Sequence, residues 1–154
     1  MLVGYVRGAG FAEYAEARYT VSTPPNIAVI STVSVGEVRS LAIQFGWGEE
    51  KKKQLNDLLR RIPHLGIGHP QILDRYAEID AYSLGKHPTK HLPGGTTAKP
   101  MGKNDIWIAA TGSILHATLL TTDGDFKHLS GAFLRVIQID QKWTAADAVA
   151  GRKP

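Results

Sequence analysis

Three carboxylates lie where a helix and a strand could bring them to one point. Asp105 stands in the stretch KNDIWIAATGSI, where Asn104 can cap a helix and Asp105 then falls in its first turn. Asp123 and Asp125 follow the short apolar and β-branched run ATLLT, which predicts a strand covered on both faces. Ligands bind at the carboxyl ends of strands in open α/β sheets. This part of the chain therefore predicts an acidic site at a strand end.

The spacing of Asp105 and Asp123 supports the same pairing. The two residues are eighteen positions apart in the sequence. A helix of about eleven residues at ~1.5 Å per residue runs ~16 Å away from the site, and a strand of about five residues at ~3.3 Å per residue returns the same distance. We therefore expect the two carboxylates to meet.

Glu37 is a fourth candidate. It stands near the start of a helix that we expect to open at Ser34 or Gly36, after the apolar run IAVIST at 27–32, which predicts a buried strand. Carboxylate oxygens suit Mg²⁺ and Mn²⁺, and carboxylates gathered without a cation repel one another. Such an ion can supply the activated water and the charge stabilisation that hydrolysis of a phosphodiester bond needs.

Each acid also has a simpler explanation. Asp105 can be a first-turn acid that the helix dipole favours. Asp123 and Asp125 can be turn formers around Gly124. Glu37 can be an exposed acid near a helix start. The sequence leaves these alternatives open.

The elements around these acids predict an α/β fold with a mainly parallel sheet, since strands alternate with helices. Strands are expected at 27–32, 117–121 and 133–139, with a possible short strand at 64–68. Residues 83–102 form a long loop rich in Gly, Pro, Lys, His and Thr, and loops of this length are usually functional or mobile. We expect one domain over residues 1–140, followed by a polar C-terminal tail at 141–154.

Composition narrows the class of protein. A chain of 154 residues suits a single domain, and the absence of cysteine excludes disulfides and thiolate metal sites. The six histidines lack a spacing that indicates a zinc site. No apolar run approaches the ~20 residues of a membrane span, so we expect a cytoplasmic protein that does not enter a membrane. The net charge of +4 is compatible with a nucleic-acid partner.

Four lysines in or beside the long loop are candidates for holding an RNA backbone, because they lie close in sequence to the acidic site. They are Lys86, Lys90, Lys99 and Lys103. The basic residues at 51–53 and 60–61 are better explained as a solvated helix face. Trp107 is expected in the core or an interface rather than as a platform for base stacking.

Three pieces of the sequence together resemble a known family. They are the helix acid Glu37 after a buried strand, the stretch NDIWIAA from Asn104, and TTDGDF from Thr121. Their order and spacing resemble a PIN domain of the VapC type, the toxin half of bacterial and archaeal toxin–antitoxin pairs. The resemblance covers roughly residues 1–140. It implies a three-layer α/β/α sandwich and an endoribonuclease, a hydrolase that depends on Mg²⁺ or Mn²⁺.

The resemblance assigns roles to the acids. It implies that Glu37, Asp105 and Asp123 belong to the catalytic, metal-binding cluster, with Asp125 as a second candidate at the strand end. The family has a further aspartate at the end of its first strand, just before an apolar helix. Because the apolar helix here begins at Leu2, we expect that strand and its aspartate to be absent, through a misplaced start or a truncated copy.

Two functions follow as hypotheses. The first is a metal-dependent toxin ribonuclease that binds RNA and a cognate antitoxin, with a homodimer as a further possibility. The second is a catalytically degenerate PIN scaffold that binds antitoxin or RNA without cleavage. A generic nucleotide-binding fold is a weaker alternative, because no Gly-rich phosphate loop follows a strand.

Overall fold

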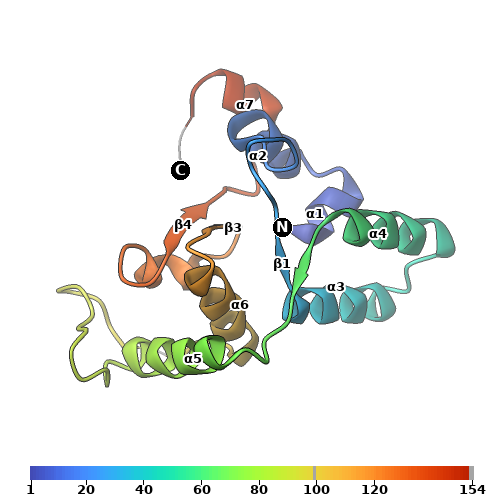
Figure 1. Ribbon diagram of the computed structural model, residues 1–154. Coiled ribbons are helices and arrows are strands. Elements are labelled where there is room, and N and C mark those ends of the chain that lie inside the picture. The colour runs from blue at the N-terminus through green and yellow to red at the C-terminus, as the bar shows by residue number, and fades with distance from the viewer. Residues whose placement is uncertain (99, 153–154) are drawn as a thin grey trace. The chain divides into compact units, whose positions relative to one another are not determined.

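Helices and short parallel strands alternate along most of the chain in the computed structural model, which describes residues 1–98 and 100–152. The chain forms two compact units, whose elements are labelled in Figure 1. Unit 1 comprises residues 1–65 together with the chain from residue 139 onward, and unit 2 comprises residues 66–138. The three acids of the 103–126 stretch all belong to unit 2, whereas Glu37 belongs to unit 1.

Unit 1 is mainly helical. Its elements are α1 (Leu2–Arg7), α2 (Gly10–Tyr19), β1 (Ile30–Ser31), α3 (Thr32–Gln44), α4 (Glu49–Arg61), β2 (His64–Leu65) and α7 (Ala145–Val149). One apolar cluster joins β1, α3 and α4, with side chains of α1 packed against it. Its buried members are Ile30, Val35, Val38, Ala42, Trp47, Leu55 and Leu59. Burial of these side chains is the main source of stability for a unit with so little sheet.

The predicted strand at 27–32 is correct only at its end. β1 pairs in parallel with β2 over two residues, with Ile30 opposite His64. Pro63 has no backbone N–H to donate to a neighbouring strand, and Gly66 follows β2 directly. β2 is therefore too short to pair with more than two residues of β1. As a result Ile27 is 79% exposed instead of buried. The helix that follows begins at Thr32, earlier than predicted, because the Ser31 hydroxyl accepts a hydrogen bond from the backbone N–H of Val33.

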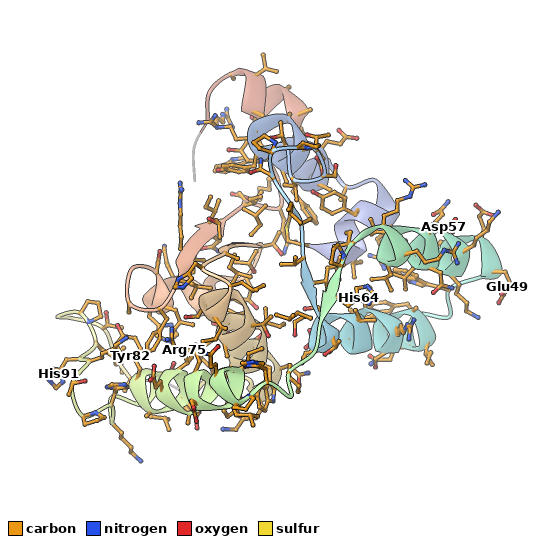
Figure 2. The ribbon with its side chains drawn as sticks, in the orientation of Figure 1. Glu49, Asp57, His64, Arg75, Tyr82 and His91 are labelled. Atoms are coloured by element: carbon orange, nitrogen blue, oxygen red, sulfur yellow. The ribbon has the colours of Figure 1, made fainter. Side chains whose placement is uncertain are left out.

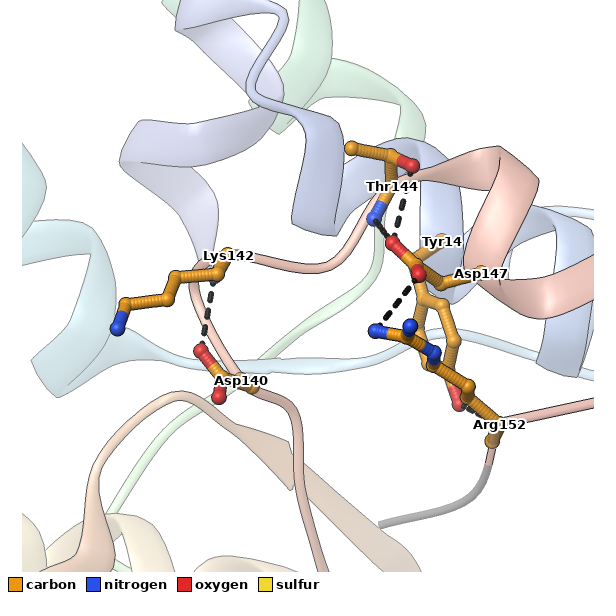
Figure 3. Close-up of polar contacts among 6 residues, drawn as sticks. All are labelled: Tyr14, Asp140, Lys142, Thr144, Asp147 and Arg152. Carbon is orange, nitrogen blue, oxygen red and sulfur yellow. Dashed lines mark hydrogen bonds and ion pairs between the residues drawn. The ribbon is translucent and has the colours of Figure 1, made fainter.

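The C-terminal segment of unit 1 carries helix α7, which packs against α2. The Tyr14 ring lies 4.8 Å from the Trp143 ring, and the Tyr14 hydroxyl donates to the carbonyl of Arg152 at 2.7 Å. Thr144 and Asp147 form a reciprocal capping box at the start of α7, and Asp147 also pairs with Arg152 (Figure 3). The polar stretch after residue 140 is therefore tied to α2 by an aromatic contact and a capped helix.

Unit 2 holds the stretch that sequence analysis singled out. Its elements are α5 (Pro70–Ser83), α6 (Lys103–Ile114), β3 (Thr118–Thr121), the 3-10 helix η1 (Gly124–Leu129) and β4 (Arg135–Gln138). β3 and β4 are parallel, with Thr118 opposite Arg135 and Thr121 opposite Gln138. In Figure 1, α6 lies between α5 and this strand pair, and it contacts both α5 and β3.

α5 is held to the rest of unit 2 by polar and aromatic contacts from one side. The Arg75 guanidinium hydrogen-bonds the Ser113 hydroxyl of α6, and Tyr82 meets the Phe133 ring edge-on at 5.2 Å. Figure 2 labels Arg75 and Tyr82 along this helix. The Ser83 hydroxyl lies 2.8 Å from Nε2 of His128 in η1. These contacts fix η1, and with it the loop that follows β3.

The predicted class is confirmed: the chain has an α/β fold whose described strands pair in parallel. Between α5 and α6, the described residues form neither helix nor strand, as expected for the long loop. Within residues 1–98 and 100–152, no helix has the length and apolar character that a membrane span requires. Leu119 and Leu120 of β3 are only half-buried, so this strand is less covered than its sequence predicts.

Candidate functional site

Asp105 lies in the first turn of α6, as predicted, but the cap is a different residue. The helix begins at Lys103 with Gly102 as its N-cap, so Asn104 is inside the helix and the prediction that it caps the helix is wrong. The Asp105 carboxylate explains the difference. Its Oδ2 lies 2.7 Å from the point that a Cβ on Gly102 would occupy, so the carboxylate folds back over the helix N-terminus. There the unpaired N–H groups of the first turn favour a negative charge.

Asp123 lies immediately beyond β3 and caps η1. Its Oδ1 accepts a hydrogen bond of 2.9 Å from the backbone N–H of Asp125, and its own N–H donates to the Thr121 hydroxyl at 3.0 Å. Asp125 falls in the first turn of η1, and both carboxylates are exposed. One carboxylate oxygen of Asp123 thus stabilises the turn around Gly124, which is the simpler explanation given for this residue above. The other oxygen is not used by that cap.

The path of the chain in unit 2 sets which ends are neighbours. α6 is followed by a tight turn in which His116 has φ 52°, and the chain then reverses into β3. At ~1.5 Å per residue the helix is about 18 Å long, and the run from the start of β3 to Asp123 covers a similar length at ~3.3 Å per residue. From these lengths we expect the N-terminus of α6 and the carboxyl end of β3 to lie at the same edge of unit 2.

Glu37 lies in the second turn of α3 and is half-buried. It belongs to unit 1, so the acids implied by the sequence come from two units. Within residues 1–98 and 100–152, no group of three or more His, Asp or Glu side chains lies close enough to hold a metal ion. The donor chemistry of the unit 2 edge still fits a hard cation, because Mg²⁺ is often held by one or two carboxylates together with waters and substrate phosphates.

Two of the four candidate lysines have partners within the protein. Lys103 Nζ lies 3.3 Å from Asp80 Oδ1 on α5, and this hydrogen bond, with the charge of Asp80, raises the pKa of Lys103. Lys90 Nζ sits over the Phe133 ring at 4.2 Å from its centroid and donates to the Ala132 carbonyl. Both ammonium groups thus already make contacts that stabilise unit 2.

Of the other two candidate lysines, only Lys86 lies within the described residues. Lys86 is exposed just beyond the end of α5, where an ammonium can reach a ligand. Lys99 lies outside the described residues. The ring of Trp107 is half-buried and lies 4.1 Å from the Tyr76 ring of α5, tilted by 36°, in line with the expected core or interface position. The sequence alone did not single out Asp80 or Gly102. Gly102 stands directly before KNDI, and a glycine at a helix start is a local signal that another group approaches the backbone closely. Asp80 offered no such signal.

One cavity of unit 2 has no predicted acid in its lining. It has a volume of about 320 Å³ and lies where α5 faces the C-terminal end of α6. Its lining residues are Gln71, Asp74, Arg75, Glu78, Ser113, Ile114 and His116. Asp123 and Asp125, by contrast, are exposed to solvent.

Comparisons with known proteins give matches at the level of structure. No protein-family model matches the sequence, and no curated protein sequence matches it. The structure resembles that of VapBC2 from Rickettsia felis, solved bound to a DNA fragment from their promoter, with a TM-score of 0.68 and 19% identity over 90% of this chain and 93% of that chain.

A second solved structure agrees with the first. It is VapBC-1 from nontypeable Haemophilus influenzae, with a TM-score of 0.60 and 25% identity over 82% of this chain and 84% of that chain. Both matches cover most of each chain and agree with the family that the acidic motifs resemble. The chain thus has a PIN-like α/β fold similar to that of VapC structures.

Proposed function

We propose that this chain is the toxin of a toxin–antitoxin pair and a metal-dependent endoribonuclease that hydrolyses RNA phosphodiester bonds in the cytoplasm. One observation carries the proposal. Asp105 stands in the first turn of α6 and Asp123 directly follows β3, and from the chain path we expect both at one edge of a PIN-like fold. A carboxylate pair at an open strand edge is suited to a polyanion that reaches the site together with a cation.

Asp105 and Asp123 would hold Mg²⁺ or Mn²⁺, with Asp125 assisting, and Glu37 is the further ligand that the family resemblance implies. When bound, the ion supplies an activated water and stabilises charge on the phosphate and on the leaving oxygen. The exposed carboxylates of Asp123 and Asp125, the half-buried carboxylate of Asp105 and the hard oxygen donor set fit such an ion.

The chain's own groups prepare the two main carboxylates for this role. The Asp105 side chain folds back over Gly102 at the α6 N-terminus, where the first-turn N–H groups attract a negatively charged ligand set. The Asp125 N–H fixes one oxygen of Asp123 and so sets the direction of the other. Positioning by backbone groups requires little reorganisation when a ligand arrives, which is what an electrostatic site needs.

An antitoxin protein is the proposed partner. Both similar structures are VapBC complexes, and one of them includes promoter DNA. We propose that this chain likewise binds a cognate antitoxin, and that a homodimer is compatible with such an assembly. Lys86, exposed after α5, is the lysine best placed to meet the RNA backbone.

Cleavage of single-stranded RNA tests the function. The chain is incubated with RNA with and without Mn²⁺, beside Asp105→Asn and the matched control Asp74→Asn, an exposed acid on α5 outside the site. We expect cleavage that requires metal, falls at least about 100-fold in Asp105→Asn, since both charge and ligand are lost, and is unchanged in the control.

Two results would contradict the proposal. Cleavage that survives in Asp105→Asn would leave that residue as a first-turn acid only. No cleavage by the folded wild-type chain would favour the degenerate scaffold, which binds antitoxin or RNA without cutting.

A further inference from the structure

Gln138 is a polar residue at the candidate edge that the sequence did not single out. It is the last residue of β4 and lies opposite Thr121, the last residue of β3. Because the two strands are parallel, both carboxyl ends face the same edge. Asp123 follows Thr121 by two residues, so the end of β4 lies beside the acidic loop.

The side chain of Gln138 reaches over that loop. A Cβ placed on Gly124 would lie 3.4 Å from Gln138 Nε2 and 3.8 Å from its Oε1. Gly124 separates Asp123 from Asp125, so the amide sits over the backbone between the two carboxylates. The glycine leaves open the space that the amide approaches.

The amide is available to a ligand. Gln138 is half-buried, and within residues 1–98 and 100–152 its side chain makes no hydrogen bond. Asp123 does not need it for orientation, because the backbone N–H of Asp125 already binds Oδ1. An N–H donor beside carboxylates adds no charge, so it would not compete with a cation as a lysine would.

We propose that Gln138 binds the RNA backbone, donating its Nε2–H to a non-bridging phosphate oxygen at the acidic edge. The proposal rests on the proposed function, in that it takes RNA as the ligand of this edge. It gives the site a neutral phosphate donor where Lys90 and Lys103 are held by Phe133 and Asp80. A glutamine contact also positions the backbone without dependence on base identity.

Two variants of Gln138 test the contact. Gln138→Met keeps the length of the side chain and removes the donor, and Gln138→Glu replaces it with a charge that repels phosphate. Gln54→Met is the matched control, because Gln54 is an exposed residue of α4 in unit 1. Binding of a short fluorescent single-stranded RNA is measured by anisotropy with EDTA present, so that cleavage cannot alter the probe. Mn²⁺ affinity, kcat, KM and the thermal unfolding midpoint are measured in parallel.

The expected result is specific to RNA. Gln138→Met should raise the RNA Kd and the KM about 10- to 100-fold, the loss expected for one hydrogen bond to a charged group, with kcat, Mn²⁺ affinity and the unfolding midpoint nearly unchanged. Gln138→Glu should weaken RNA binding further, and Gln54→Met should match the wild type.

Other results overturn the proposal. An unchanged RNA Kd in Gln138→Met would exclude the contact, and a parallel loss of Mn²⁺ affinity or thermal stability would show a structural role instead. RNA binding that needs Gln138 without any cleavage would refute only the proposed ribonuclease activity. No RNA binding by the wild type, either in EDTA or with a non-cleavable RNA and Mn²⁺, would refute both proposals.

Discussion

The carboxylate of Asp105 occupies the space that a side chain on Gly102 would need, with Oδ2 only 2.7 Å from the position of a Cβ there. Gly102 has an ordinary negative φ, so backbone strain does not require a glycine at this N-cap. The requirement comes from the approach of Asp105, which turns back over the first turn of α6. This contact couples the helix cap to the candidate metal ligand.

Gly102→Ala should therefore displace the Asp105 carboxylate. We expect Mn²⁺ affinity and kcat to fall about tenfold or more, because a ligand shifted by even part of an ångström loses much of its contribution. Stability should fall by no more than about 1 kcal/mol, the cost of alanine at an N-cap. Metal titration and RNA cleavage kinetics measure the effect. Gly68→Ala is the control, since a Cβ on Gly68 meets nothing within 4 Å; equal metal affinity in both variants would refute the coupling.

The ion pair of Lys103 with Asp80 predicts a loss of stability at high pH. The hydrogen bond to Asp80, and its charge, raise the pKa of Lys103 above the ordinary 10.5 in the folded state. A raised folded pKa means that the stabilisation is complete below pH 10.5 and is lost as the pH rises through the folded value. The difference in unfolding midpoint between wild type and Asp80→Asn should thus shrink from pH 8 to pH 11.5. A difference that stays constant would mean that the pair does not stabilise the fold.

Lys86 should contribute more to RNA binding than Lys103 does. Lys86 is exposed, whereas Lys103 must leave Asp80 before it can bind a phosphate. We expect Lys86→Gln to weaken RNA binding several-fold and to lower the slope of log Kd against log salt by about 0.7, the value for one phosphate of a single strand. Lys103→Gln should change both quantities less. Fluorescence titrations of both variants at three salt concentrations measure the RNA Kd and its salt slope. A larger effect of Lys103→Gln than of Lys86→Gln would contradict the prediction.

Lys90 should act through stability. Its ammonium lies 4.2 Å from the centre of the Phe133 ring and donates to the Ala132 carbonyl. Lys90→Gln should lower the free energy of unfolding by about 0.5–1 kcal/mol through the lost cation–π contact. Denaturant unfolding measures the loss, with Lys51→Gln on the exposed face of α4 as the control. An unchanged stability with weaker RNA binding would restore Lys90 as an RNA ligand.

The capping box of α7 should lose its effect in acid. The N–H and hydroxyl of Thr144, with the charge of Arg152, lower the pKa of Asp147 below its ordinary 3.8. Because the folded pKa is lowered, the stabilisation is present above pH 3.8 and disappears as the pH falls through the folded value. Thr144→Ala should destabilise unit 1 by about 1 kcal/mol at pH 7, the usual cost of losing an N-cap. Release of α7 should expose the chain after residue 140 to protease. An unchanged cleavage rate in Thr144→Ala would argue that the contacts of Tyr14 with Trp143 and Arg152 hold the helix without the capping box.

The sequence by itself determined the class of fold and the local places of the acids. The periodicity of 103–114, the reversal at His116 and the run ATLLT are local patterns, and each produced its element at nearly the predicted residues. The first-turn position of Asp105 and the strand-end position of Asp123 follow from the same local patterns. A helix, a tight turn and a strand in direct succession leave little freedom in how their ends are arranged.

Only the tertiary structure decided how far each strand extends and which side chains are already bound. The exposure of Ile27 depends on β2, a partner 34 positions away from Ile30 that is bounded by Pro63 and Gly66. The partners of Lys103 and Lys90 and the reach of Gln138 over Gly124 join residues from 14 to 43 positions apart. Contacts of this kind depend on how elements pack rather than on local preference, so no local pattern of residue types could have shown them.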